Sequence, residues 1–215
     1  MSGRLRAWLV FVGLFATITY AANFAAKQPK GYEPLYHYAT AVSGAVQFAL
    51  MLGITLAIAV GAPWRELFAL RRPRTRWTVG GPILLLAGVL ILNRILDPFL
   101  HPGKEQGLLP PRWEPGHAGA YAANAVVIVL LAPIVEELLF RGMGYSLLEP
   151  HGRTLAIVGV GVAFALAHGL VDAFPLLAAL GAGLAWLRSK TDSVYPGMAT
   201  HALFNGIAVL AVIIR

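Results

Sequence analysis

Apolar residues occur along this chain in long blocks, separated by short stretches rich in proline, glycine and basic residues. The blocks run roughly over residues 7–26, 36–62, 79–99, 119–141, 154–171, 174–188 and 195–214. Each block is long enough, or nearly so, to cross about 30 Å of hydrocarbon as an α-helix. The pattern predicts an all-α fold, a polytopic transmembrane helical bundle of about seven membrane helices, as a single membrane domain over residues 1–215.

The block at 174–188 and the first block differ from the other five. The block at 174–188 is short and contains Ala178, Gly181 and Ala182, whose small side chains let helix backbones approach closely in a membrane. The first block follows Arg4 and Arg6, as a signal sequence would, but its core is long and no good cleavage site ends it. We therefore expect it to be retained as the first helix.

Basic residues gather on one side of the predicted membrane. With the N-terminus inside, the inner positions are Arg4, Arg6, Arg65, Arg71, Arg72, Arg74, Arg76, Arg141, Arg153, Arg188 and Lys190. The outer positions are Lys27, Lys30, Lys104, Arg112 and Arg215. Because short cytoplasmic loops carry an excess of Lys and Arg, this asymmetry predicts a cytoplasmic N-terminus.

Composition agrees with this pattern and excludes other classes of protein. The chain is 58% apolar and only 13% charged, whereas soluble domains carry about a quarter charged residues. Its net charge of +7 comes largely from basic loops between apolar blocks, so topology and anionic lipid explain the charge and no nucleic-acid partner is expected. There are no cysteines, which excludes disulfides, thiolate metal sites and a cysteine nucleophile.

Three sets of polar residues lie in the last four blocks, where charged and imidazole side chains are costly and usually functional. The sets are Glu136-Glu137 with Arg141, Phe164 with His168, and His201 with Asn205. Glu137 and Arg141 are four apart, so they share a helix face and can pair. Glu136 points about 100° away from that face. One carboxylate is thus expected in an ion pair, and the other is free for another partner.

The first two sets are predicted to face each other across a helical hairpin. The chain turns near Glu149-Pro150-His151-Gly152. Measured from residue 151, Glu136 lies 15 positions back and His168 lies 17 positions forward, which places them at the same depth within about 3 Å. This arrangement requires the fourth helix to continue past Gly142 to about Leu148.

The other polar residues of the blocks have structural explanations. Arg94 and Asp97 are three apart near the outer end of the third helix, where they can pair or reach the interface. His37 can be solvated at the interface, and Gln47 and Asn124 can make hydrogen bonds between helices.

The three sets are suited to the hydrolysis of an acyl bond. A glutamate beside an imidazole can deprotonate a water molecule that the imidazole holds in place. A second pair of hydrogen-bond donors, His and Asn, can stabilise the oxyanion that then develops. Ser146 and Ser193 lie in interfacial loops without an obvious base, so no covalent nucleophile competes. A peptide bond is the expected target.

In this order, on successive helices, the sets resemble the motifs of the CPBP family, the CAAX protease and bacteriocin-processing group that is also called Abi. The family motifs EExxxR, FxxxH and HxxxN are matched by Glu136-Glu137 with Arg141, Phe164 with His168, and His201 with Asn205. The resemblance covers a core of about residues 119–210, and the first three helices carry no motif.

This resemblance implies a glutamate-type intramembrane endopeptidase. Glu136 would be the general base that activates water, and His168 would help to position that water. His201 and Asn205 would form the oxyanion site. Supporting roles, by pairing or packing, would belong to Glu137, Arg141 and Phe164. No cofactor is implied, and the substrate would be a membrane-associated protein or peptide.

Several alternatives stay open at this point. Histidines and carboxylates can bind zinc, so a zinc protease is possible, although Asn205 is a poor zinc ligand and no HExxH pairing occurs. A non-catalytic binding or immunity protein would use the same pocket, whereas a transporter would need broken helices in matching halves. Prenylated C-terminal peptides, leader peptides and sorting tails all fit as substrates. The small size and short loops resemble the prokaryotic members, which implies a bacterial or archaeal plasma membrane.

Overall fold

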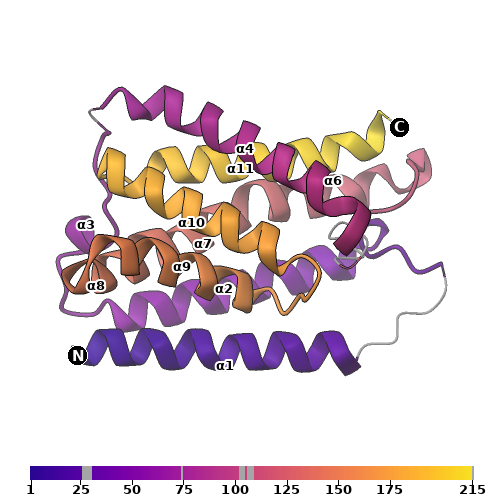
Figure 1. Ribbon diagram of the computed structural model, residues 1–215. Helices are drawn as coiled ribbons and strands as arrows, with labels where there is room; N and C mark the ends of the chain where they lie inside the picture. Colours follow the sequence, from indigo (N-terminus) through magenta and orange to yellow (C-terminus); the bar gives the residue numbers. More distant parts are fainter. Residues whose placement is uncertain (26–30, 74, 102–104, 106–108, 215) are drawn as a thin grey trace.

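The computed structural model describes residues 1–25, 31–73, 75–101, 105 and 109–214. Within these ranges the chain is helical apart from its connections, and no strand occurs (Figure 1). The long helices are α1 (Gly3–Ala25), α2 (Tyr38–Ile58), α4 (Trp77–Leu100), α9 (Arg153–Ala167), α10 (Phe174–Thr191), α11 (Tyr195–Ile213) and one helical run over Pro115–His151. Each predicted apolar block therefore coincides with a helix over most of its length, and the all-α polytopic bundle is confirmed.

Five of these helices are long and apolar enough to cross a membrane. They are Gly3–Ala25, Tyr38–Ile58, Trp77–Leu100, Pro115–His151 and Tyr195–Ile213. Of the remaining two, α9 has 15 residues and would span only about 22 Å, and α10 carries Arg188 and Lys190 in its last turn. The helix α10 is mostly buried among its neighbours, whereas α9 has an exposed apolar face that includes Leu155 and Val158.

The run over Pro115–His151 is continuous but contains two π-helical segments. Its parts are η2 (Pro115–His117), α6 (Ala118–Val126), the π-helix η3 (Val127–Leu131), α7 (Ala132–Glu136), the π-helix η4 (Glu137–Gly144), α8 (Tyr145–Leu148) and η5 (Glu149–His151). The helix thus passes Gly142 and reaches Leu148, as the hairpin prediction required. The chain then turns at Gly152, where φ is +126°, and enters α9.

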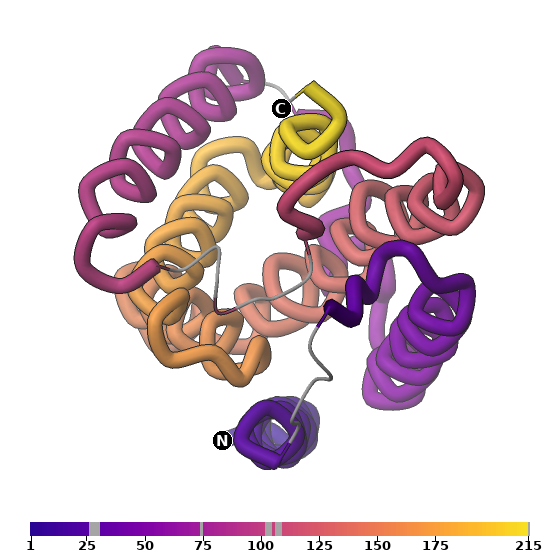
Figure 2. Tube along the Cα trace, turned by 90° about the vertical axis from the view of Figure 1, so that its right-hand side faces the viewer, coloured from indigo at the N-terminus to yellow at the C-terminus, as the bar shows by residue number. Residues whose placement is uncertain are grey.

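Two shorter elements lie in the connections: η1 (Pro34–Tyr36) before α2, and α3 (Trp64–Leu67) between α2 and α4. Viewed along the bundle, α1 lies at the periphery, beside α2 and α9 (Figure 2). The hairpin of α9 and α10 forms the most closely packed part of the molecule.

Small residues explain how α9 and α10 come so close. A Cβ added to Gly161 would lie 2.7 Å from the backbone nitrogen of Ala182, and one added to Gly181 would lie 3.0 Å from the Cα of Gly161. No side chain larger than hydrogen fits at either position. The predicted close packing of the 174–188 block is confirmed.

The polar residues given structural explanations divide into those that find partners and those that do not. Asn124 donates from Nδ2 to the carbonyls of Leu35 and His37, at 3.1 and 3.0 Å, and so links α6 to the segment that enters α2. Arg94 and Asp97 are both exposed, and no ion pair joins them within the described chain. Reaching the interface, rather than pairing, is the explanation that fits these two.

Two arginines that the topology count places in inner loops are buried within the bundle instead. Arg141 has no exposed side-chain surface, and Arg188, 4% exposed, pairs with Asp192 at 2.9 Å. Because both side chains are buried, neither arginine indicates which side of the bundle faces the cytoplasm. Of the other counted positions, Lys27, Lys30, Arg74, Lys104 and Arg215 lie outside the described residues.

Candidate active site

The ion pair predicted at the end of the motif helix is present. Arg141 Nη1 donates to Glu137 Oε1 at 2.8 Å, and both side chains are fully buried. The guanidinium also donates from Nη2 to the carbonyl of Gly181 at 3.0 Å. Because Gly181 lies in α10, this arginine ties the motif helix to the α9–α10 hairpin. The sequence predicted the pair but gave no sign of the bond to α10.

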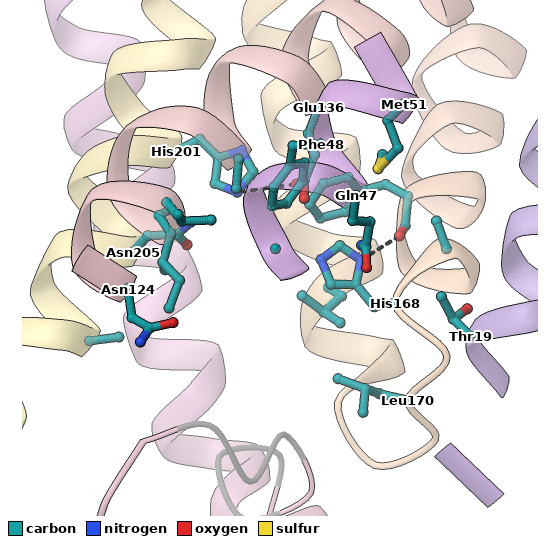
Figure 3. A pocket seen from close by; sticks show the side chains of 18 of the residues that line it. Thr19, Gln47, Phe48, Met51, Asn124, Glu136, His168, Leu170, His201 and Asn205 are labelled. Carbon is teal, nitrogen blue, oxygen red and sulfur yellow. Dashed lines mark hydrogen bonds and ion pairs between the residues drawn. The ribbon is translucent and has the colours of Figure 1, made fainter. Parts of the chain in front are cut away.

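Glu136 lies beside a different partner from the one expected for it. Its Oε2 is 3.7 Å from Nε2 of His201, whose Nδ1 is 3.2 Å from Oε1 of Glu137 (Figure 3). One imidazole of α11 therefore contacts both adjacent carboxylates. The hairpin prediction had placed Glu136 opposite His168. His168 lines the same cavity as Glu136, and no hydrogen bond joins the two within the described chain.

His168 lies at the end of α9, not within a helix that runs to residue 171 as the apolar block suggested. The helix ends at Ala167 because Gly169 adopts φ +66°, a conformation that glycine tolerates best. His168 Nδ1 is 2.7 Å from the carbonyl of Phe164. A carbonyl only accepts, so Nδ1 carries the proton, and Nε2 of the neutral ring is left with its lone pair.

The turn that carries His168 is held from the side by α1. Asn23 Nδ2 donates to the carbonyl of Gly169, and the Tyr20 hydroxyl donates to the carbonyl of Leu170, both at 3.1 Å. A Cβ added to Gly169 would lie 2.5 Å from the carbonyl carbon of Thr19. The sequence did not predict these contacts, because α1 carries no motif. Gly169 was the one sign in the sequence that the helix ends here.

Asn205 is positioned by an irregularity in the facing helix. In η3 the Ala132 N–H bonds to the Val127 carbonyl, five residues back. The next residue in this register, Pro133, has no N–H to give to the carbonyl of Ile128. Asn205 Nδ2 donates to that carbonyl at 2.8 Å. One of the two amide hydrogens of Asn205 is thus used for packing, and the second stays available.

The ring of Phe164 packs against Arg141, His168 and His201. Its ring centroid lies 4.2 Å from the guanidinium carbon of Arg141, 4.6 Å from the ring of His168 and 5.6 Å from the ring of His201. Cation–π and aromatic contacts of this kind favour one fixed arrangement of the groups around the ring. The packing role expected for Phe164 agrees with this geometry.

The polar groups face a cavity of about 470 Å³. Glu136, His168, His201 and Asn205 line one part of it, and residues of α1 and α2 line the opposite part (Figure 3). Most of the remaining lining is apolar, with several phenylalanine and leucine side chains. Such a space is able to hold an extended apolar peptide segment against a small polar centre.

Within the described part of the chain, no group of three His, Cys, Asp or Glu side chains is placed to hold an ion. Glu137 Oε1 is taken by Arg141 and His201, and Nδ1 of His168 is taken by the Phe164 carbonyl. Glu137 and Nδ1 of His168 are thus engaged with protein groups, whereas Nε2 of His168 keeps its lone pair.

Comparison with known proteins identifies the motif-bearing part of the chain. Residues 118–207 match the family model described as type II CAAX prenyl endopeptidase Rce1-like. This segment is Rce1-like. It begins with α6 and ends within α11, so it contains all three motifs, and α1, α2 and α4 lie outside it. No curated protein and no solved structure matches the chain.

The match confirms the resemblance to the CPBP family, to which CAAX endopeptidases belong. Together with the five apolar helices, it makes the chain an integral membrane protein. The family that this segment matches is described as one of CAAX prenyl endopeptidases.

Proposed function

We propose that this protein is a glutamate-type intramembrane endopeptidase that cleaves a membrane-associated substrate with a water molecule activated by Glu136. The observation that carries the proposal is that Glu136, His168, His201 and Asn205, from three separate helical segments, line one cavity. The Rce1-like match supports the class of reaction.

In the proposed first step, the water lies between the Glu136 carboxylate and Nε2 of His168. Nε2 accepts one hydrogen of the water, because Nδ1 holds the ring proton against the Phe164 carbonyl. Glu136 takes the other proton as the water oxygen bonds to the substrate carbonyl carbon. The carbon–nitrogen bond then breaks, and Glu136 returns its proton to the leaving nitrogen. The products are a new carboxyl group and a new amine.

The oxyanion of this intermediate would be stabilised by His201 and Asn205. Asn205 has one amide hydrogen beyond the one it gives to Ile128. His201 directs Nδ1 at Glu137 and Nε2 toward Glu136. For Nε2 to donate to an oxyanion while Nδ1 donates to Glu137, both ring nitrogens must carry protons.

We propose that the reaction needs no metal. The side-chain arrangement supports this, because no three His, Cys, Asp or Glu side chains of the described residues are grouped around one point. A peptide substrate with a CAAX-type C-terminus is the class that the family match favours. The apolar lining of the cavity would suit such a hydrophobic tail, and leader peptides and sorting tails would fit by the same argument.

The test is cleavage of a farnesylated CAAX peptide and its unprenylated counterpart by the purified protein in proteoliposomes, with products identified by mass spectrometry. We expect Glu136→Gln to lower the rate by about 10²–10⁴-fold, because the base is lost. Its folding should be retained, since the Glu136 side chain has no arginine partner and is partly exposed at the cavity.

Retained cleavage by Glu136→Gln would refute the assignment of the base. The metal-free mechanism predicts full activity after treatment with a strong chelator. Activity lost to the chelator and restored by zinc would overturn that mechanism. Binding of the peptides with no cleavage by the wild type would instead favour a non-catalytic binding protein.

A further inference from the structure

Gln47, like Arg94 and Asp97, is a polar residue of a membrane helix without a partner among the described residues, but it differs from them in lining the cavity. The sequence suggested a hydrogen bond between helices, but none joins its carboxamide to any residue that the structure describes. Asn124 and Asn205, by contrast, are bonded to backbone carbonyls of other segments. Gln47 lies in the middle of α2, where an unpaired polar group is costly.

The side chain of Gln47 is exposed, and it faces the cavity rather than a neighbouring helix. It lines the same cavity as Glu136 and His168, and its carboxamide points into that space from the α2 side (Figure 3). Gln47 is outside the segment that matches the Rce1-like family. Its position opposite the motif residues therefore adds a polar group that no motif records.

Gln47 belongs to a polar stripe on one face of α2. Thr40, Ser43 and Gln47 follow at spacings of three and four, and all line the cavity. The Ser43 hydroxyl is bonded to the carbonyl of Thr40, its own preceding turn. Of these side chains, the Gln47 carboxamide has the longest reach and offers both donors and an acceptor.

A peptide held for hydrolysis in this cavity needs such a group. The peptide group next to the scissile bond also leaves water, and a buried N–H or C=O without a partner costs free energy comparable to a lost hydrogen bond. In the proposed mechanism Glu136 and His168 hold the water, while His201 and Asn205 face the oxyanion. These four residues are then unavailable to a flanking peptide group.

We infer that Gln47 is a substrate-binding residue that pairs its carboxamide with one backbone peptide group flanking the scissile bond. A carboxamide presents the same donor and acceptor pair as a peptide group, so the two can pair much as neighbouring strands do. This contact would fix the register of the peptide along the cavity. The inference rests on the proposed function, because it takes the occupant of the cavity to be a peptide substrate.

The test combines a variant of Gln47 with substrates that lack single backbone N–H groups. Gln47→Met keeps the length of the side chain but removes its hydrogen bonding. The matched control is Thr17→Val on α1, whose exposed hydroxyl is bonded to its own helix and which is not among the residues that line the cavity. The substrates are a farnesylated CAAX peptide and analogues in which one flanking amide at a time is replaced by an ester.

We expect Gln47→Met to raise KM by about three- to tenfold at nearly unchanged kcat, the effect of one neutral hydrogen bond. One ester analogue should raise KM for the wild type by a similar factor. The same analogue should not raise KM for Gln47→Met any further, because that variant has already lost the contact. Thr17→Val should match the wild type with every substrate. Unchanged KM in Gln47→Met, a change in kcat alone, or a full ester penalty in Gln47→Met would overturn the inference.

Binding to catalytically inactive protein separates this inference from the proposed function. The affinity of the intact farnesylated peptide is measured for Glu136→Gln and for Glu136→Gln combined with Gln47→Met, both in nanodiscs. If the wild type cleaves nothing, the proposed function fails, yet a weaker affinity of the double variant still supports Gln47 as a peptide contact. Equal affinities, or no binding at all, overturn the role of Gln47.

Discussion

The segment that matches the Rce1-like family and the helices before it contribute to the site in different ways. Residues 118–207 carry every motif residue and the buried ion pair. The helices α1, α2 and α4 carry no motif, yet α1 and α2 line one wall of the cavity. The chemistry is thus concentrated in one part of the chain, and much of the space that receives the substrate is formed by the other.

The N-terminal helices also hold the matched segment in place. Trp8 Nε1 donates to the carbonyl of Leu139 at 3.0 Å, within the π-helix η4. Gly142 packs closely against Phe68: a Cβ added to Gly142 would lie 3.1 Å from the Cα of Phe68. Such contacts show that a family match limited to part of a chain can omit the residues that fix the geometry of the site.

The largest effect is expected within the matched segment, at its buried ion pair. Glu137→Gln leaves the fully buried Arg141 without a charged partner, and breaking a buried pair in this way costs about 3–5 kcal/mol. We therefore expect a much lower midpoint of thermal unfolding in detergent, or poor recovery of folded protein. The measurement compares this variant with Glu136→Gln.

Glu136→Gln is the matched control because it makes the same chemical change at the adjacent position. Its side chain lies 11% exposed at the cavity and has no arginine partner. It should lose activity but unfold near the wild-type temperature. Equal unfolding temperatures for the two variants would contradict the division between a structural and a catalytic glutamate.

Sequence spacing was enough to predict two parts of the site, even though the ion pair lies in the π-helix η4. Glu137 and Arg141 pair as their spacing of four indicated, and the helical hairpin forms as the turn near residue 151 indicated. In both cases the argument needed only local geometry, which a single stretch of sequence determines.

The departures come from irregular backbone and from contacts between distant segments. His168 lies at a helix end set by Gly169, and Asn205 bonds to Ile128 because a π register and Pro133 free that carbonyl. The spacing of apolar residues predicts that a helix forms, but it does not predict where the hydrogen bonding changes from α to π. The contact of His201 with both glutamates joins α11 to the motif helix, which no local pattern encodes.

A smaller effect is expected where the two regions meet, at the turn after His168. Gly169→Ala places a Cβ 2.5 Å from the Thr19 backbone and strains a residue at φ +66°. We expect a loss of about 1–3 kcal/mol in the free energy of unfolding. Cleavage activity should fall as well, because α1 must move away from the turn that positions His168.

Gly31→Ala provides the control for this variant. Gly31 also has a positive φ, +78°, but an added Cβ would meet no atom within 4 Å. It shares the backbone strain of Gly169→Ala without the collision with α1, so its activity should stay at the wild-type level. If both variants lose activity equally, the contact with Thr19 has no part in positioning His168.

The smallest effect is expected from Tyr20→Phe, which removes only the hydroxyl that α1 donates to the Leu170 carbonyl. The loss of one partly buried hydrogen bond should cost about 1 kcal/mol and lower the unfolding midpoint by about 2–4 °C. Tyr195→Phe, at an exposed tyrosine of α11, should leave the midpoint unchanged.

Because Asn23 still bonds to the Gly169 carbonyl, the turn should keep its shape, and cleavage by Tyr20→Phe should remain within about twofold of the wild type. A large loss of activity at an unchanged midpoint would mean that Tyr20 acts on the reaction itself, so that α1 does more than hold the turn.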